Sequence, residues 1–182
     1  MRLEVVIPPE NEPVELDEAR RFCRIDSDLT EEDALLTTFI TAAREQVEVM
    51  TGRALAPQTL RMTLDSAPRE RSVMLPRVPL IEVEDVTFAG EMVEGWTVTT
   101  TSVPAVLSYP HAWPAGEMGI TFRCGYGAEE TEACPERARQ ALLFLVSHWY
   151  EERLPVVVGR TATSVPMTVD SLISPLKTWV WR

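Results

Sequence analysis

The residues best suited to chemistry in this sequence are its two histidines and the acids near them. His148 precedes Glu151 and Glu152 in a stretch with helical apolar spacing, so a carboxylate-supported base is conceivable there. Sequence neighbours do not face each other on a helix, which favours a packed or partly exposed histidine. His111 lies in the turn-rich stretch YPHAWPAG, where no carboxylate follows at a useful spacing.

Other motifs with catalytic or ligand-binding associations fall short of their patterns. GYGAEE (125–130) has two glycines but is not the G-x-G-x-x-G phosphate motif. DSDLTEEDALL (26–36) is acidic, yet it lacks the central glycine and ligand spacing of a calcium loop, and its acids are better placed to cap a helix. Ser102, Ser147 and Ser164 stand outside any G-x-S-x-G context. We therefore expect no catalytic residues, no cofactor, no metal and no enzyme activity.

Composition narrows the function further. The chain has 182 residues, 45% hydrophobic content and a net charge of −11, which suits one folded domain and speaks against a surface that clamps nucleic acid. We expect no membrane span and no signal peptide, because apolar runs are short and the first residues soon turn acidic. The three cysteines are an odd number without C-x2-C spacing, which favours buried free thiols over disulfides or zinc. The sequence thus predicts a protein kept in a cytoplasm, or in something assembled there.

Helical periodicity dominates both ends of the chain. Residues 13–25 read as a helix of about three turns. A longer helix follows, with Thr30 and Asp33 resembling a capping box and Gly52 supplying a left-handed stop. A third helix is expected after Pro135. The apolar stripes of these two longer helices are formed by Leu36, Ile40, Ala43, Val47, Met50, Ala138, Leu142, Leu145, Val146 and Trp149.

Between the helical segments, alternating runs predict short antiparallel strands. In the first run Leu60, Met62 and Leu64 alternate with polar residues, the period of two that a half-buried strand requires. The order of helices, strands and helices indicates an α+β fold, in which a small helical bundle formed by the N- and C-terminal segments carries an inserted antiparallel β block. We expect one domain, 1–182, with a helical core of 1–56 and 127–155, a β insertion of 57–126 and a C-terminal arm of 156–182.

The end of the chain, SLISPLKTWVWR (171–182), is unusually apolar for a terminus, which is normally polar and frayed. It is also basic, since residues 153–182 hold four cationic side chains against Asp170 alone, whereas residues 1–50 hold 13 acids against 5 arginines. Two interpretations stay open: the segment packs onto its own subunit as core, or it reaches a neighbour after the linker VVVGRTATSVP (156–166). Paired tryptophans suit the second, because aromatics are enriched among interface hot spots.

Three stretches resemble signature motifs of the tailed-phage head–tail connector (adaptor) family. Residues 33–55 resemble its long first helix with a Thr-Gly-Arg stop. Residues 125–153 resemble a second motif, with Gly-Tyr, an acidic loop, a Pro-started helix and Trp-Tyr-Glu-x-Arg. Residues 165–176 resemble the closing Val-Pro and short helix ending in Leu-x-Ser-Pro. The motifs stand in the family's order, and the β block looks like the insertion of the longer branch found in prophages and gene transfer agents.

The resemblance implies a structural role without cofactors. Subunits of such a family form a ring, expected here at about twelve copies, between the portal of the filled head and the tail. DNA would pass through the channel without specific binding, and a stopper or other tail or neck proteins would adjoin. The particle would be assembled in the bacterial host cytoplasm, with this chain in its neck. The alternative is another neck or head-completion protein, such as a stopper or tail-terminator partner.

Two sets of residues are expected to form contacts in that ring. The C-terminal arm should dock on the portal or a neighbouring subunit, with residues 165–182 leaving their own subunit, through Val165, Pro166, Leu172, Ile173, Leu176, Trp179 and Trp181. Some of the surplus acids, especially those in the second helix and at its start, should face the channel or an adjoining seam, because a neutral or acidic lining lets DNA slide. An ordinary solvated outer helix face is the alternative for these acids, which are Glu31, Glu32, Asp33, Glu45 and Glu48.

Overall fold

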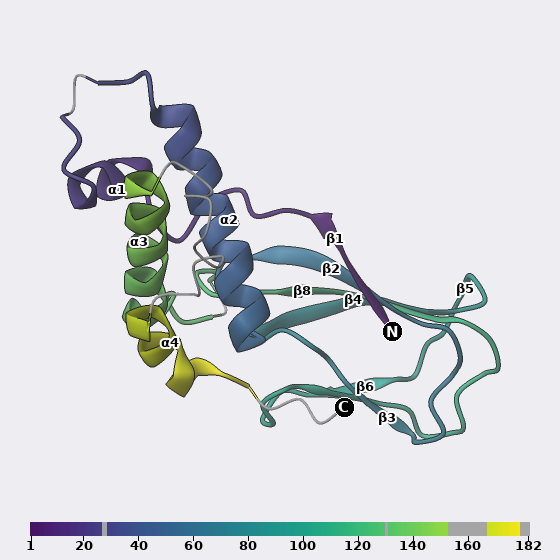
Figure 1. Cartoon of the computed structure of the whole chain (residues 1–182). Helices are drawn as coiled ribbons and strands as arrows, with labels where there is room; N and C mark the ends of the chain where they lie inside the picture. Colours follow the sequence, from purple (N-terminus) through teal and green to yellow (C-terminus); the bar gives the residue numbers. More distant parts are fainter. Residues whose placement is uncertain (27–28, 130, 153–166, 179–182) are drawn as a thin grey trace, which may run out of the picture. The chain divides into compact units, whose positions relative to one another are not determined.

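The computed structural model describes residues 1–26, 29–129, 131–152 and 167–178 (Figure 1). The chain divides into two compact units. A helical unit comprises residues 12–51 and 134–177, and a β unit comprises residues 1–11 and 52–133 together with Thr178. Each unit is therefore built from segments that are far apart in the sequence.

The helical unit contains the predicted helices in the expected order. They are α1 (Leu16–Phe22), α2 (Asp33–Thr51), α3 (Glu136–Glu151) and α4 (Met167–Ile173), with the 3-10 turn η1 (Ser174–Leu176) after α4. α2 packs along α3, and α3 also packs against α1 and α4 (Figure 1). Most residues of the stripes predicted for the two longer helices are buried, and Leu36, Val47 and Leu142 have no exposed surface. The periodicity of the sequence thus identified the faces that hold this unit together.

The ends of the helices partly differ from the predicted ones. α1 spans seven residues and so is shorter than the expected three turns. α2 begins at Asp33, so Thr30 does not stand at its N-cap. Instead the Asp33 carboxylate accepts a hydrogen bond from Nε of Arg20 at 2.8 Å, an ion pair that ties α1 to the start of α2. The predicted stop is confirmed, because Gly52 follows α2 with φ +72, a left-handed conformation that favours glycine.

The β unit holds a five-stranded and a three-stranded sheet, both antiparallel. Its strands are β1 (Arg2–Ile7), β2 (Gln58–Leu64), β3 (Ser72–Met74), β4 (Leu80–Phe88), β5 (Glu91–Met92), β6 (Thr97–Thr99), β7 (Val106–Ser108) and β8 (Met118–Cys124). The larger sheet has the order β1-β2-β8-β4-β5 and the smaller one β3-β7-β6. The alternating runs predicted between residues 57 and 126 form β2, β3, β4, β6, β7 and β8, and β5 is an additional short strand. The extended start of the chain pairs with β2 as β1, so it groups with the strands although it precedes the first helix.

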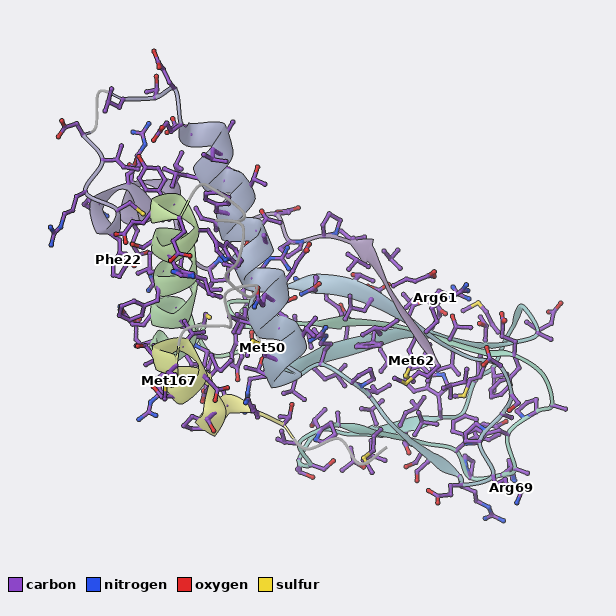
Figure 2. All side chains as sticks on the ribbon, viewed as in Figure 1. Phe22, Met50, Arg61, Met62, Arg69 and Met167 are labelled. Atoms are coloured by element: carbon purple, nitrogen blue, oxygen red, sulfur yellow. The ribbon has the colours of Figure 1, made fainter. Side chains whose placement is uncertain are left out.

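The core of the β unit lies between the two sheets. Phe122, Ile120 and Met118 of β8 are fully buried together with Leu107 of β7. Figure 2 shows Arg61 and Met62 on opposite sides of β2, and Met62, only 1% exposed, belongs to this core. The alternation read from the sequence therefore separates a polar face from an apolar one.

The α+β class predicted from the sequence is confirmed by this arrangement of helices and antiparallel sheets. β2 to β8 lie within the span expected for the insertion, while the proposed division into a core, an insertion and an arm remains a prediction. Among the described residues, no helix combines the length and the apolar character that a membrane crossing would need.

Candidate functional site

His148 lines a small open pocket on α3 and α4. The pocket encloses about 200 Å3 and is lined by Phe144, Ser147, His148, Glu151 and Thr168. His148 lies 3.5 Å from Glu152, its carboxylate partner one helical turn away, and is 23% exposed. The Ser147 hydroxyl donates to Glu151 at 3.5 Å. Ser147 and His148, the two side chains that could transfer a proton, therefore contact different carboxylates. The pocket thus contains two separate side-chain pairs at the surface.

The backbone amides of GYGAEE are used inside the β unit. Gly125 donates to the carbonyl of Pro79 at 2.9 Å, and Gly127 donates to that of Glu132 at the same distance. Tyr126 donates to the carbonyl of Ala54 at 3.3 Å, and its hydroxyl accepts a hydrogen bond from Arg53. A phosphate cradle requires such amides to point at a ligand. The motif instead fastens the segment after β8 to the segment after α2.

The acids near the start of α2 also contact protein groups. Asp33 receives the Arg20 guanidinium, and Glu32 accepts a hydrogen bond from the Tyr150 hydroxyl of α3. Within the described residues, no cluster of three or more histidine, cysteine, aspartate or glutamate side chains could hold a metal ion. These acids therefore connect the helices of the unit to one another.

Glu48 is the member of the acidic set whose position differs most from the expected one. Its side chain is only 6% exposed and meets Nη1 of Arg44 at 3.1 Å. Nε of Arg44 donates at 2.8 Å to Glu12, in the segment before α1. A carboxylate buried against a guanidinium inside its own unit cannot line a channel, so the expectation for Glu48 is wrong. Burial of a charge requires such a partner, and Arg44 supplies it.

Glu31 and Glu45 are the two members of the set that lie exposed. Glu45 has a side-chain exposure of 66% and lies 3.8 Å from Arg44, a long ion-pair distance. Exposed pairs of this kind contribute little stability. These two residues therefore remain able to face a channel, a seam or solvent.

Part of the C-terminal segment packs on its own subunit. Val169 and Ile173 of α4 have no exposed surface, and α4 lies against α3. Leu172 and Leu176 are half-buried, and Lys177 donates to Asp170 at 2.9 Å. The expectation that residues 165–182 leave their subunit is therefore wrong for 167–177, because the apolar face of this short helix completes the helical core. The other expected interface residues, Val165, Pro166, Trp179 and Trp181, lie outside the described residues.

Sequence reasoning missed an apolar surface on β1. Val5, Val6 and Ile7 are 58%, 52% and 56% exposed, although consecutive β-branched residues normally mark a buried strand. Met167 at the start of α4 is 90% exposed and labelled in Figure 2. The signal for β1 was the run RLEVVI itself, in which polar and apolar residues alternate over the first four positions and two further apolar residues, Val6 and Ile7, follow.

Comparisons with known proteins identify one family and one kind of assembly. A model of the head completion protein family matches residues 14–174. Solved structures that resemble the whole chain include one described as the neck of an empty gene transfer agent particle computed with C6 symmetry, at a TM-score of 0.80 and 24% identity. Another is the virion of a native gene transfer agent particle, at 0.78 and 25%. A third is the neck of a native particle computed with C12 symmetry, at 0.76 and 24%. Each alignment covers 100% of this chain and 98% of the other. No curated protein matches the sequence significantly.

Proposed function

From the premise that the chain belongs to the head completion protein family, we propose that it forms a ring that joins the portal of a filled head to the tail machinery. Its role is structural, in the neck of a phage-like or gene transfer agent particle. The family is a structural family and not an enzyme family. The observation that carries the proposal is the family match over residues 14–174, nearly the whole chain.

The ring would contain about twelve copies and leave a channel for DNA. The similar neck structures were computed with C6 and C12 symmetry, which is compatible with this number. A surface lining such a channel should not bind phosphates, because each contact with a basic side chain adds salt-dependent affinity. The exposed acids Glu31 and Glu45 are the members of the predicted set that suit that lining.

The C-terminal tail, which we define as Trp179–Arg182, would attach each subunit to the portal or to a neighbour. Two tryptophans and Arg182 fall within these four residues, and such side chains supply much of the binding energy at interfaces. A short deletion is the appropriate test, since Ile173 is part of the helical core and must be kept. Removing Trp179–Arg182 should leave the unfolding midpoint of the subunit unchanged and abolish its stable attachment to DNA-filled heads.

A matched control is the exchange of Met167 for Ala, which removes exposed apolar surface elsewhere in the C-terminal segment. This variant should attach normally. Particles that acquire functional tails with the shortened chain would contradict the docking role of the tail. A map of the particle that places the chain against the tail and away from the portal would favour the alternative of a stopper or tail-terminator partner.

A further inference from the structure

β1 is an edge strand whose outer side could pair with a strand of another molecule. Among the described residues β1 pairs with β2 alone, and its register skips Val6 at a bulge between Val5 and Ile7. Edge strands are usually protected by charges, proline or short length. In β1 the charged residues Arg2 and Glu4 lie at the start of the strand. At its other end, Val5, Val6 and Ile7 are each more than half exposed.

The opposite edge of the same sheet is open along the first part of β4. β5 pairs only with Thr87 and Phe88, at the far end of β4. Between Leu80 and Asp85, the described strands provide one neighbour, β8. This free stretch begins with Leu80 and Ile81 and continues into acids, Glu82, Glu84 and Asp85.

The two edges are complementary in direction and in chemistry. β1, β2, β8 and β4 alternate in direction, so β4 of a copy placed beside β1 in the same orientation would run antiparallel to it. That direction brings Val6 and Ile7 toward Leu80 and Ile81. It also brings Arg2 toward the acidic end of the β4 edge, where Glu84 is exposed.

We propose that β1 of each subunit pairs antiparallel with the Leu80–Asp85 edge of β4 in the next copy, which joins the five-stranded sheets into a belt around the ring. The proposal rests on the ring function proposed above. A contact between two different edges is head-to-tail, and such contacts close into rings when the rotation between copies permits. Main-chain hydrogen bonds would supply affinity and the apolar ends would set the register.

Cross-linking in assembled particles tests the pairing. Val6→Cys and Ile81→Cys are introduced together in a Cys23→Ser, Cys134→Ser background, and thiols are oxidised to disulfides with copper phenanthroline. Opposed residues of antiparallel strands lie within the range of Cα separations that a disulfide spans. The double variant should give a ladder of covalent oligomers on a non-reducing gel, and each single variant should stay monomeric.

Three other outcomes would overturn the proposal. A ring that is visible by electron microscopy but yields no ladder rejects the pairing and leaves the ring function intact. Dimers from Val6→Cys alone mean that β1 pairs with β1. Particles that contain the chain without any ring reject the proposed function itself.

A charge exchange keeps the test decisive if the cysteine variants fold poorly. Arg2→Glu alone and Glu84→Arg alone should each lower the yield of rings several-fold at low salt, and the combination should restore it, since like charges are removed from the junction. As a control, Arg2→Glu combined with Glu132→Arg adds the same charge at an exposed position that belongs to neither β1 nor β4 and should not restore assembly. Equal yields for all variants would contradict the proposal.

Discussion

Arg44 and Glu48 form an ion pair at 3.1 Å in which the two side chains are only 5% and 6% exposed. The same guanidinium reaches Glu12 at 2.8 Å, and Glu12 also accepts a hydrogen bond from Thr41 at 3.0 Å. The segment before α1 is thereby attached to the middle of α2. A buried pair of this kind is sensitive to the loss of either partner, because the remaining charge keeps its desolvation cost.

Arg44→Met should therefore destabilise the isolated subunit strongly. Loss of one partner of a buried pair costs about 3–5 kcal/mol. Urea unfolding followed by circular dichroism measures the difference. The double variant Arg44→Met, Glu48→Met should recover a substantial part of that loss, because no fully buried charge remains. A double variant that is less stable than Arg44→Met alone would contradict this account.

Gly125→Ala should be far more damaging than the neighbouring exchange Gly127→Ala. A Cβ at Gly125 would lie 2.1 Å from the carbonyl oxygen of Ala56, and the residue has φ +133. At Gly127 the φ of +86 imposes only the backbone cost, since no atom lies within 4 Å of the added Cβ. We expect a loss of about 1 kcal/mol for Gly127→Ala and failure to fold, or several times that loss, for Gly125→Ala.

The thermal midpoints of the two glycine variants can be compared directly by differential scanning fluorimetry. Equal midpoints would mean that the segments after α2 and β8 can separate without any loss of stability of the folded protein.

Ile173→Ala should reveal that α4 is part of the helical core. Ile173 has no exposed surface, and truncation of a buried Ile costs about 2–5 kcal/mol. Met167→Ala, in the same helix but at 90% exposure, should change stability by less than about 0.5 kcal/mol. Denaturant midpoints give both values. An Ile173→Ala variant as stable as the parent would favour the alternative in which this helix leaves its subunit.

Cys134 should be unreactive toward thiol reagents in the folded protein. Burial raises the pKa of its thiol to about 12, and the charges of Glu136 and Glu48 oppose the lowering effect of Arg139. Because the thiolate is the reactive form, alkylation by iodoacetamide at pH 8 should be at least about tenfold slower than in urea. The measurement is made by mass spectrometry of the peptide that contains Cys134.

The same shift predicts the direction of the pH dependence of stability. Below the ordinary pKa of 9.0, the thiol is protonated in both states and has no effect. As the pH rises from there toward about 12, only the unfolded chain loses the proton, so unfolding becomes more favourable. Cys134→Ser should show a smaller decrease in stability over this range. An identical decrease in both proteins would contradict the assignment.

The sequence predicted the family and most elements because those depend on local patterns. The three motif resemblances are confirmed by the family match and by the likeness to gene transfer agent neck structures. The stripe of α2 was recognisable because Leu36, Ile40 and Val47 recur at helical spacing. The expected kinship with head–tail proteins followed from the resemblance and is confirmed by membership of the head completion protein family, and the fold is that of proteins solved in gene transfer agent necks.

Features that depend on contacts far along the chain were not predictable. Glu48 resembles any exposed helical acid until Arg44 and the distant Glu12 are seen around it. Ile173 sits in a stretch whose apolar residues suited an interface equally well, and only the position of α3 shows that it is core. Val6 is an exposed edge residue because its neighbours in β1 pair with β2. The run RLEVVI alone does not show which strand β1 pairs with.

The division of the helical unit between residues 12–51 and 134–177 has a consequence for synthesis on the ribosome. When α2 emerges, the helix that covers its apolar stripe has not yet been translated, so the strands between them must be made before the helices can close. A nascent chain therefore lacks a finished helical unit, although nearly all of the β unit, up to residue 133, has by then been made. Contacts that the helical unit makes with other copies can therefore form only after α3 has been translated, later than contacts made by the strands.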